Sequence, residues 1–109
     1  MLKNDMSKKG YRKNLGEYAD NIERTYSGNI VKATDRNILC VRDIRDANGN
    51  LVAEHINTRL TNKELIKQVK KMLQKNRYDV NFKGTVYMYR RNGSGSIDYS
   101  ININKIEAK

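Results

Sequence analysis

A short stretch of the chain gathers the side chain types that acid–base catalysis uses: Asp43, Asp46, Glu54 and His55. A hydrolytic or acid–base enzyme needs a nucleophile paired with a base, or two carboxylates whose pKa values are separated. These four residues fall on one expected β-hairpin, beside two arginines that can neutralise the carboxylates. We therefore interpret them as a solvated hairpin, and we expect no catalytic site, no metal and no cofactor.

Thiol and metal chemistry have few residues to draw on. Cys40 is the only cysteine of the chain and His55 is the only histidine. A four-ligand zinc site is nearly excluded because these are the only soft ligands. A single cysteine cannot form an intrachain disulfide, which fits a protein kept in a reducing cytosol. Cys40 alternates in phase with Ile38, so we expect it to be a small core residue.

Basic residues outnumber acidic residues along the chain. The 109 residues include 22 Lys and Arg against 12 Asp and Glu, for a net charge of +10. The positive excess lies in residues 1–13 and 63–91, and this localised field favours a polyanionic partner. No apolar stretch is long enough for a transmembrane helix, and no apolar run follows the first charged residues as in a secretory signal. We therefore expect a cytoplasmic protein without a membrane partner, and the oligomeric state stays open.

The elements that must position these residues begin with one clear helix. The length fits a single domain with one small core. A helix is predicted over 61–76, where Thr61 and Glu64 form a capping box and Asn76 is a plausible C-cap. The residues of its apolar stripe recur at helical spacing, and lysines occupy the opposite face. The stripe consists of Leu65, Ile66, Val69, Met72 and Leu73.

Five strands are predicted, over 25–34, 38–46, 51–60, 78–91 and 97–107. The Asn48-Gly49 pair between the second and third strands is a strong hairpin signal, and Gly28 predicts a bulge or bend in the first strand. The last two strands alternate, which predicts one inward-facing row on each. These rows are Val80, Phe82, Gly84, Val86 and Met88 on the fourth strand, and Ile97, Tyr99, Ile101 and Ile103 on the fifth.

This order of elements predicts a mainly β protein. A helix between the third and fourth of five strands fits the OB-type Greek-key barrel. An open antiparallel sheet with one helix packed across it is the alternative. The barrel domain is expected over residues 25–109, after a basic N-terminal arm over 1–24. Within that arm, Leu15, Tyr18 and Ile22 fit one face of a short helix that docks on the barrel.

Two segments resemble a family of small uncharacterised phage proteins with OB-type folds. Residues 41–55 combine an Arg-Asp strand, an Asn-Gly hairpin and the acidic-His pair Glu54-His55, and residues 80–86 form an alternating barrel strand. The resemblance covers about residues 25–107, and it implies an OB-type fold and a phage origin. The enrichment in Asn, Lys and Ile, which have AT-rich codons, is compatible with a phage genome.

The expected fold suggests where a partner would bind. OB-folds bind single strands across strands two and three, between the loops that join strands 1–2 and 4–5, with basic groups for phosphates and flat rings for base stacking. We therefore expect a non-enzymatic protein that binds single-stranded DNA or RNA through a basic, tyrosine-containing groove. The candidate residues are Lys32, Arg36, Arg42, Arg59, Lys83, Tyr87, Tyr89, Arg90 and Arg91. A secondary basic set comprises Lys8, Lys9, Arg12, Lys13, Lys67, Lys70 and Lys71.

Two alternatives accompany this hypothesis. Tyr87 and Tyr89 could pack under the N-terminal segment, and the helix lysines could form only a solvated face. The protein could also be a phage anti-defence inhibitor of the anti-CRISPR type, which docks on a host nuclease or nucleoprotein effector. Such an inhibitor needs no catalytic residue and could use the same basic surface.

Overall fold

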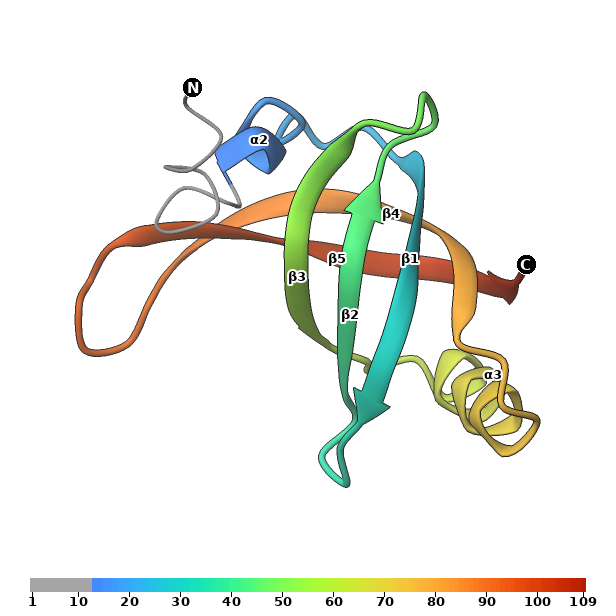
Figure 1. The fold of residues 1–109 in the computed structure, drawn as a ribbon. Helices are drawn as coiled ribbons and strands as arrows, with labels where there is room; N and C mark the ends of the chain where they lie inside the picture. Colours follow the sequence, from blue (N-terminus) through green and yellow to red (C-terminus); the bar gives the residue numbers. More distant parts are fainter. Residues whose placement is uncertain (1–12) are drawn as a thin grey trace.

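The computed structural model describes residues 13–109 and is mainly β. Its elements follow the order strand, strand, strand, helix, strand, strand after a short N-terminal helix, as Figure 1 shows. In chain order they are α2 (Lys13–Gly16), β1 (Arg24–Ala33), β2 (Ile38–Arg45), β3 (Leu51–Arg59), α3 (Lys63–Gln74), β4 (Asp79–Arg90) and β5 (Ile97–Ala108). The five predicted strands and the predicted helix are thus confirmed close to their expected bounds. The secondary basic residues Lys8, Lys9 and Arg12 lie outside the described residues.

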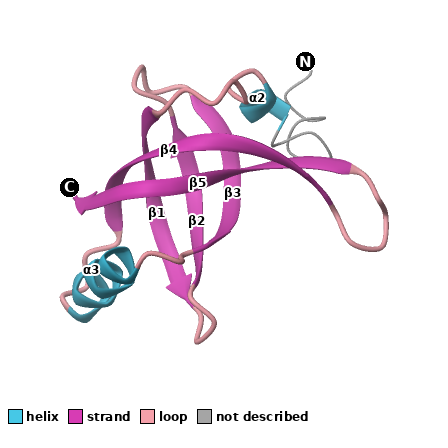
Figure 2. Cartoon of the chain, turned by 180° about the vertical axis from the view of Figure 1, so that it is seen from behind, coloured by secondary structure: helices cyan, strands magenta, loops and turns pink. Residues whose placement is uncertain are grey.

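The strands form one open antiparallel sheet in the order β3-β2-β1-β4-β5. In Figures 1 and 2, β1, β2 and β3 make one layer, and the long β4–β5 hairpin crosses it. The edge strands β3 and β5 share no backbone ladder within the described chain. They are joined instead through a side chain, because the Ser100 hydroxyl donates to the Asn57 carbonyl oxygen at 3.2 Å.

Two glycines mark the places where the sheet bends. The β1–β2 register shifts between Ser27 and Asn29, which confirms the irregularity expected at Gly28. The β4–β5 register shifts between Lys83 and Gly84, at the point where β4 stops pairing with β1. Such bulges increase local twist, and an interior glycine permits close backbone approach. The strands can therefore coil around a core that a flat sheet could not enclose.

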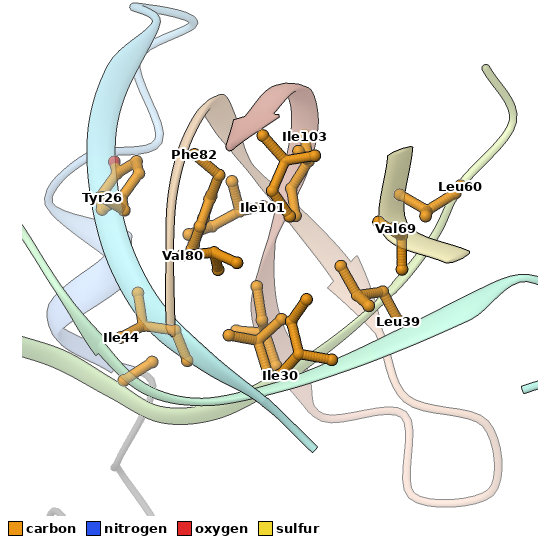
Figure 3. Close-up of a cluster of buried hydrophobic side chains, with 14 of the residues drawn as sticks. Tyr26, Ile30, Leu39, Ile44, Leu60, Val69, Val80, Phe82, Ile101 and Ile103 are labelled. Carbon is orange, nitrogen blue, oxygen red and sulfur yellow. The ribbon is translucent and has the colours of Figure 1, made fainter. Parts of the chain in front are cut away.

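The core lies between the two layers and is closed at each end by a helix. Tyr26 and Phe82 stack in this core with ring centroids 5.8 Å apart (Figure 3). Val80 and Ile101 are fully buried in the same cluster. The apolar stripe of α3 contributes Leu65, Val69 and Met72, as predicted, and α2 contributes the fully buried Leu15. In the described part of the chain, no helix is long and apolar enough to cross a membrane.

The helix α3 begins differently from the prediction. Asn62, rather than Thr61, is the N-cap, and its side-chain oxygen accepts from the backbone N–H groups of Glu64 at 2.8 Å and Leu65 at 3.4 Å. The capping box expected between Thr61 and Glu64 is therefore wrong. Asn and Thr are both competent N-caps, so the choice depends on where the chain leaves β3. Asn76, with φ 56°, takes the left-handed position that follows the Lys75 C-cap.

Three residues predicted to face the core are instead exposed. Met88 is 60% exposed and Ile97 is 49% exposed, because they lie on the part of the β4–β5 hairpin that extends past the other strands (Figures 1 and 2). Ile22 is 54% exposed, since α2 ends at Gly16 and the chain leaves helical geometry before reaching it. The predicted alternation is correct on β4, where only the covering layer is missing at Met88. On β5 it is wrong between Ile97 and Ser100, because Asp98 and Ser100 are buried there instead of Ile97 and Tyr99.

Candidate nucleic-acid interface

Four cations gather around the β1–β2 loop, residues 34–37, and we call this set the basic pole: Lys32, Arg36, Arg59 and Lys70. Lys32 is near the end of β1 and Arg36 is in the loop. Arg59 ends β3, and the next residue, Leu60, donates its backbone N–H to the Asn37 carbonyl oxygen at 2.8 Å. Lys70 lies on α3, across a groove that Asn37 also lines. Three of the predicted residues and one of the secondary set therefore lie on elements at one end of the fold, where Figure 1 shows the β1–β2 loop and α3.

Local hydrogen bonds fix the backbone that carries Arg36. The Thr34 hydroxyl accepts from the backbone N–H groups of Arg36 at 3.3 Å and Ile38 at 3.1 Å. The backbone N–H of Asn37 donates to the Thr34 carbonyl oxygen at 3.0 Å, and Asn37 adopts φ 63°. The loop is thus a tight turn with defined backbone geometry, which fixes the backbone position from which the Arg36 side chain extends.

The outer face of β2 continues from the basic pole. Cys40 pairs in register with Lys32 of β1 and with Asn57 of β3, and Arg42 pairs with His55 of β3. Paired residues share a face of the sheet, so these side chains form successive rows. Cys40 is half-buried on this outer face, whereas its neighbours Leu39 and Val41 are in the core, so its expected core position is wrong. Arg42 is exposed two positions further along, which places it on the same surface as Lys32.

The predicted tyrosines lie elsewhere, on the β4–β5 hairpin. The rings of Tyr87 and Tyr89 are 6.1 Å apart at 46°, and Tyr87 is 40% exposed while Tyr89 is half-buried. The Tyr89 hydroxyl and the Arg91 Nε both donate to Asp98, at 3.5 Å and 2.8 Å. Arg90 donates to the Gly95 carbonyl oxygen at 3.0 Å. These contacts brace the hairpin, and they engage both predicted arginines within it.

Lys83 occupies a third location. It pairs in register with Thr25 of β1 and with Lys105 of β5, and it lines a cavity of about 510 Å³ between α3 and the β4–β5 hairpin. Glu64 and Glu107 also line this cavity, so its charge is mixed. The residues predicted to line a single groove therefore lie in three separate places: the basic pole with Arg42, the β4–β5 hairpin, and this cavity.

The lysines of α3 face away from the core. Lys67 and Lys71 are exposed on the side opposite the buried stripe, whereas the exposed Lys70 flanks the stripe at the groove. Among residues 13–109, the ion pairs involve Arg24, Arg45 and Arg91, and none involves an α3 lysine. The helix thus extends the positive surface of the basic pole.

Asp43 and Asp46 of the β2–β3 hairpin make structural contacts. Asp43 forms an ion pair with Arg45 at 3.0 Å. Asp46 accepts from the backbone N–H groups of Asn48 and Asn50, each at 2.9 Å, and from the Tyr18 hydroxyl at 2.9 Å. These hydrogen bonds, that from Asn50 foremost, lower the pKa of Asp46. No group of three His, Cys, Asp or Glu side chains within the described residues is placed to hold a metal ion.

The segment between α2 and β1 is held against the sheet by charge. Arg24 donates to both carboxylate oxygens of Asp20, at 2.6 and 2.8 Å, and lies 4.9 Å from the Tyr18 ring centroid. The Arg24 guanidinium lowers the pKa of Asp20 to about 2. The hydrogen bond to Asp46 raises the pKa of Tyr18. Tyr18 therefore links this segment to the β2–β3 turn, as expected for a docked N-terminal element.

Two amide side chains at the basic pole, Asn37 and Gln74, carry no sequence signal beyond their polar type. Both line the groove between the β1–β2 loop and α3, and only the fold brings them together.

Comparisons of the chain with protein-family models, with curated proteins and with solved structures give no match.

Proposed function

We propose that this chain is a non-enzymatic protein with an OB-type fold that binds single-stranded DNA or RNA. The fold assignment is supported by the sheet order β3-β2-β1-β4-β5 and by the position of α3 between β3 and β4. In a Greek-key barrel the two edge strands of the sheet come together. Here the edge strands are β3 and β5, and the Ser100–Asn57 hydrogen bond joins them.

The basic pole is the observation that carries the proposal. Its four cations are exposed, and none of them is in an ion pair with a carboxylate of residues 13–109. The only carboxylate of the β1–β2 loop itself is Asp35, so four cations share this end of the fold with one acidic loop residue. The pole is therefore net positive, and phosphate groups that bind to it release counterions. The outer face with Arg42 adjoins the pole and extends the surface that a single strand would follow, with Asp43 and Glu54 beside Arg42.

The test is a fluorescence anisotropy titration of labelled oligo(dT) and oligo(U) at low salt. The pole variant carries Lys32→Ala, Arg36→Ala and Arg59→Ala, and we expect its affinity to fall more than tenfold. The matched control, with Lys83→Ala, Lys105→Ala and Lys109→Ala, removes three cations elsewhere and should weaken binding much less. Equal decreases in the two variants would show that only net charge matters, and absent binding by the wild-type protein would refute the proposal.

The hairpin favours a second candidate, an anti-defence inhibitor that docks on a nuclease or nucleoprotein effector. Met88 and Ile97 are exposed on a protruding arm that the Arg91–Asp98 ion pair braces. Exposed apolar side chains that cluster on one feature are typical of protein-contact surfaces. This candidate predicts that a pull-down from a host lysate recovers a defined protein partner, and that the complex persists after nuclease treatment. The Met88→Glu variant should no longer recover that partner. In either case the proposed setting is the cytoplasm, that of the host cell for a phage-encoded chain.

A further inference from the structure

A small groove with an apolar floor lies inside the basic pole. Its volume is about 220 Å³, and it separates the β1–β2 loop from α3. Leu60, Ile66, Val69 and Leu73 provide the apolar lining. The polar lining comes from Asn37, Gln74, Thr34 and Lys70. Lys70 is the cation of the lining, and the exposed Arg36 precedes Asn37 in the loop, whereas Lys32 and Arg59 lie on the adjoining outer face of the sheet.

We propose that this groove holds one nucleobase of a bound single strand, while the basic pole contacts the flanking phosphates. The inference rests on the proposed function and names the part of the ligand that the groove takes. Pockets for drug-sized ligands measure roughly 300–1,000 Å³, so a groove of about 220 Å³ suits a single ring system. A nucleobase has apolar faces, a polar edge and anionic neighbours, which matches the apolar floor, the two amides and the Lys70 ammonium of the lining.

The amide of Asn37 is positioned to read the base edge. Its backbone is held from both sides, because its N–H donates to Thr34 and its carbonyl accepts from Leu60. Asn37 has φ 63°, a left-handed conformation that asparagine tolerates in turns. The Asn37 side chain makes no hydrogen bond to another described residue, and neither does that of Gln74, so both amides are available. An amide offers a donor and an acceptor, which suits a nucleobase edge.

The variants for the test remove the amides without disturbing the fold. Asn37→Gly retains the backbone hydrogen bonds and tolerates the positive φ, and Gln74→Ala lies on an exposed helical position. Gln68→Ala is the matched control, because Gln68 is exposed on the same helix but lines the larger cavity instead. Thermal melting of each variant verifies that the protein is folded.

The assay follows oligo(dT) that contains a single 2-aminopurine. Insertion into an aromatic-free groove should raise its emission and shift it to shorter wavelength, because the base leaves the stack for an apolar site. Asn37→Gly and Gln74→Ala should each weaken binding about threefold to tenfold, as expected for removal of one hydrogen bond. Both variants should also remove the emission change, whereas Gln68→Ala should leave affinity and emission at wild-type levels.

The outcomes separate this inference from the proposed function. Absence of oligonucleotide binding by the wild-type protein would overturn both. If alanine substitution of the pole cations weakens binding but Asn37→Gly and Gln74→Ala do not, the proposal that the groove holds a nucleobase is wrong, while the proposed function stands. Quenched rather than enhanced emission would likewise contradict the groove, since it would indicate stacking on a tyrosine.

Discussion

Replacing Gly84 by alanine tests whether close strand approach at the β4 bulge shapes this fold. A Cβ on Gly84 would lie 2.4 Å from the Asn102 carbonyl oxygen and 2.8 Å from the Ile101 Cγ2 atom. The first contact is with backbone, so no rotamer change relieves it, and β4 and β5 must separate locally. Overpacking of this kind costs about 1–3 kcal/mol, and the reduced entropy of the unfolded chain offsets up to about 1 kcal/mol of that.

The net decrease expected for Gly84→Ala is therefore about 1–2 kcal/mol of unfolding free energy. For a domain of this size each kcal/mol shifts the Tm by about 4–8 °C, so a decrease of about 4–16 °C is expected. Circular dichroism melting and urea denaturation both measure it. Thr85→Ala is the control, because Thr85 is the next residue and its half-buried side chain faces outward. A Gly84→Ala Tm equal to that of the wild type would refute the account of the bulge.

Three other stability predictions follow from the contacts. Since the folded-state pKa of Asp20 is about 2, its contribution is complete above the unfolded value near 4 and is lost as pH falls toward 2. Asp46, whose pKa is also lowered, acts in the same direction, so Asp20→Asn with Asp46→Asn should flatten the acid limb of Tm against pH. Asn62→Ala should cost about 1 kcal/mol in urea denaturation, whereas Thr61→Ala should be nearly neutral. The Tyr26 hydroxyl is buried with no partner among the described residues, so Tyr26→Phe should leave the melting temperature unchanged or higher.

The elements that short-range patterns specify were predictable from the sequence. The apolar stripe of α3 and the Asn48-Gly49 turn each depend on residues a few positions apart. The turn forms with Gly49 at φ 87° and with its N–H donating to the Asp46 carbonyl oxygen at 3.0 Å. Alternation within β4 likewise separates core positions from outer positions wherever another layer covers the strand.

Features set by distant segments were not predictable in the same way. Met88 follows the alternation of β4, yet it is exposed because the other layer ends before reaching it. Cys40 shares the phase of Ile38, but the choice of inward face depends on the pairing with β1 and β3. The basic pole illustrates the same limit, since Asn37 and Lys70 are far apart in sequence and only the packing of α3 beside the β1–β2 loop places both in one groove.

The salt dependence of oligonucleotide affinity tests the central claim most directly. If the protein binds four to six phosphates, log K plotted against log salt should have a slope of roughly −3 to −4 for a single strand. Replacing the four cations of the basic pole by alanine should remove most of that slope, by about 0.7 for each phosphate that the variant no longer binds. A wild-type protein without measurable binding at low salt, or a pole variant with the wild-type slope, would contradict the claim.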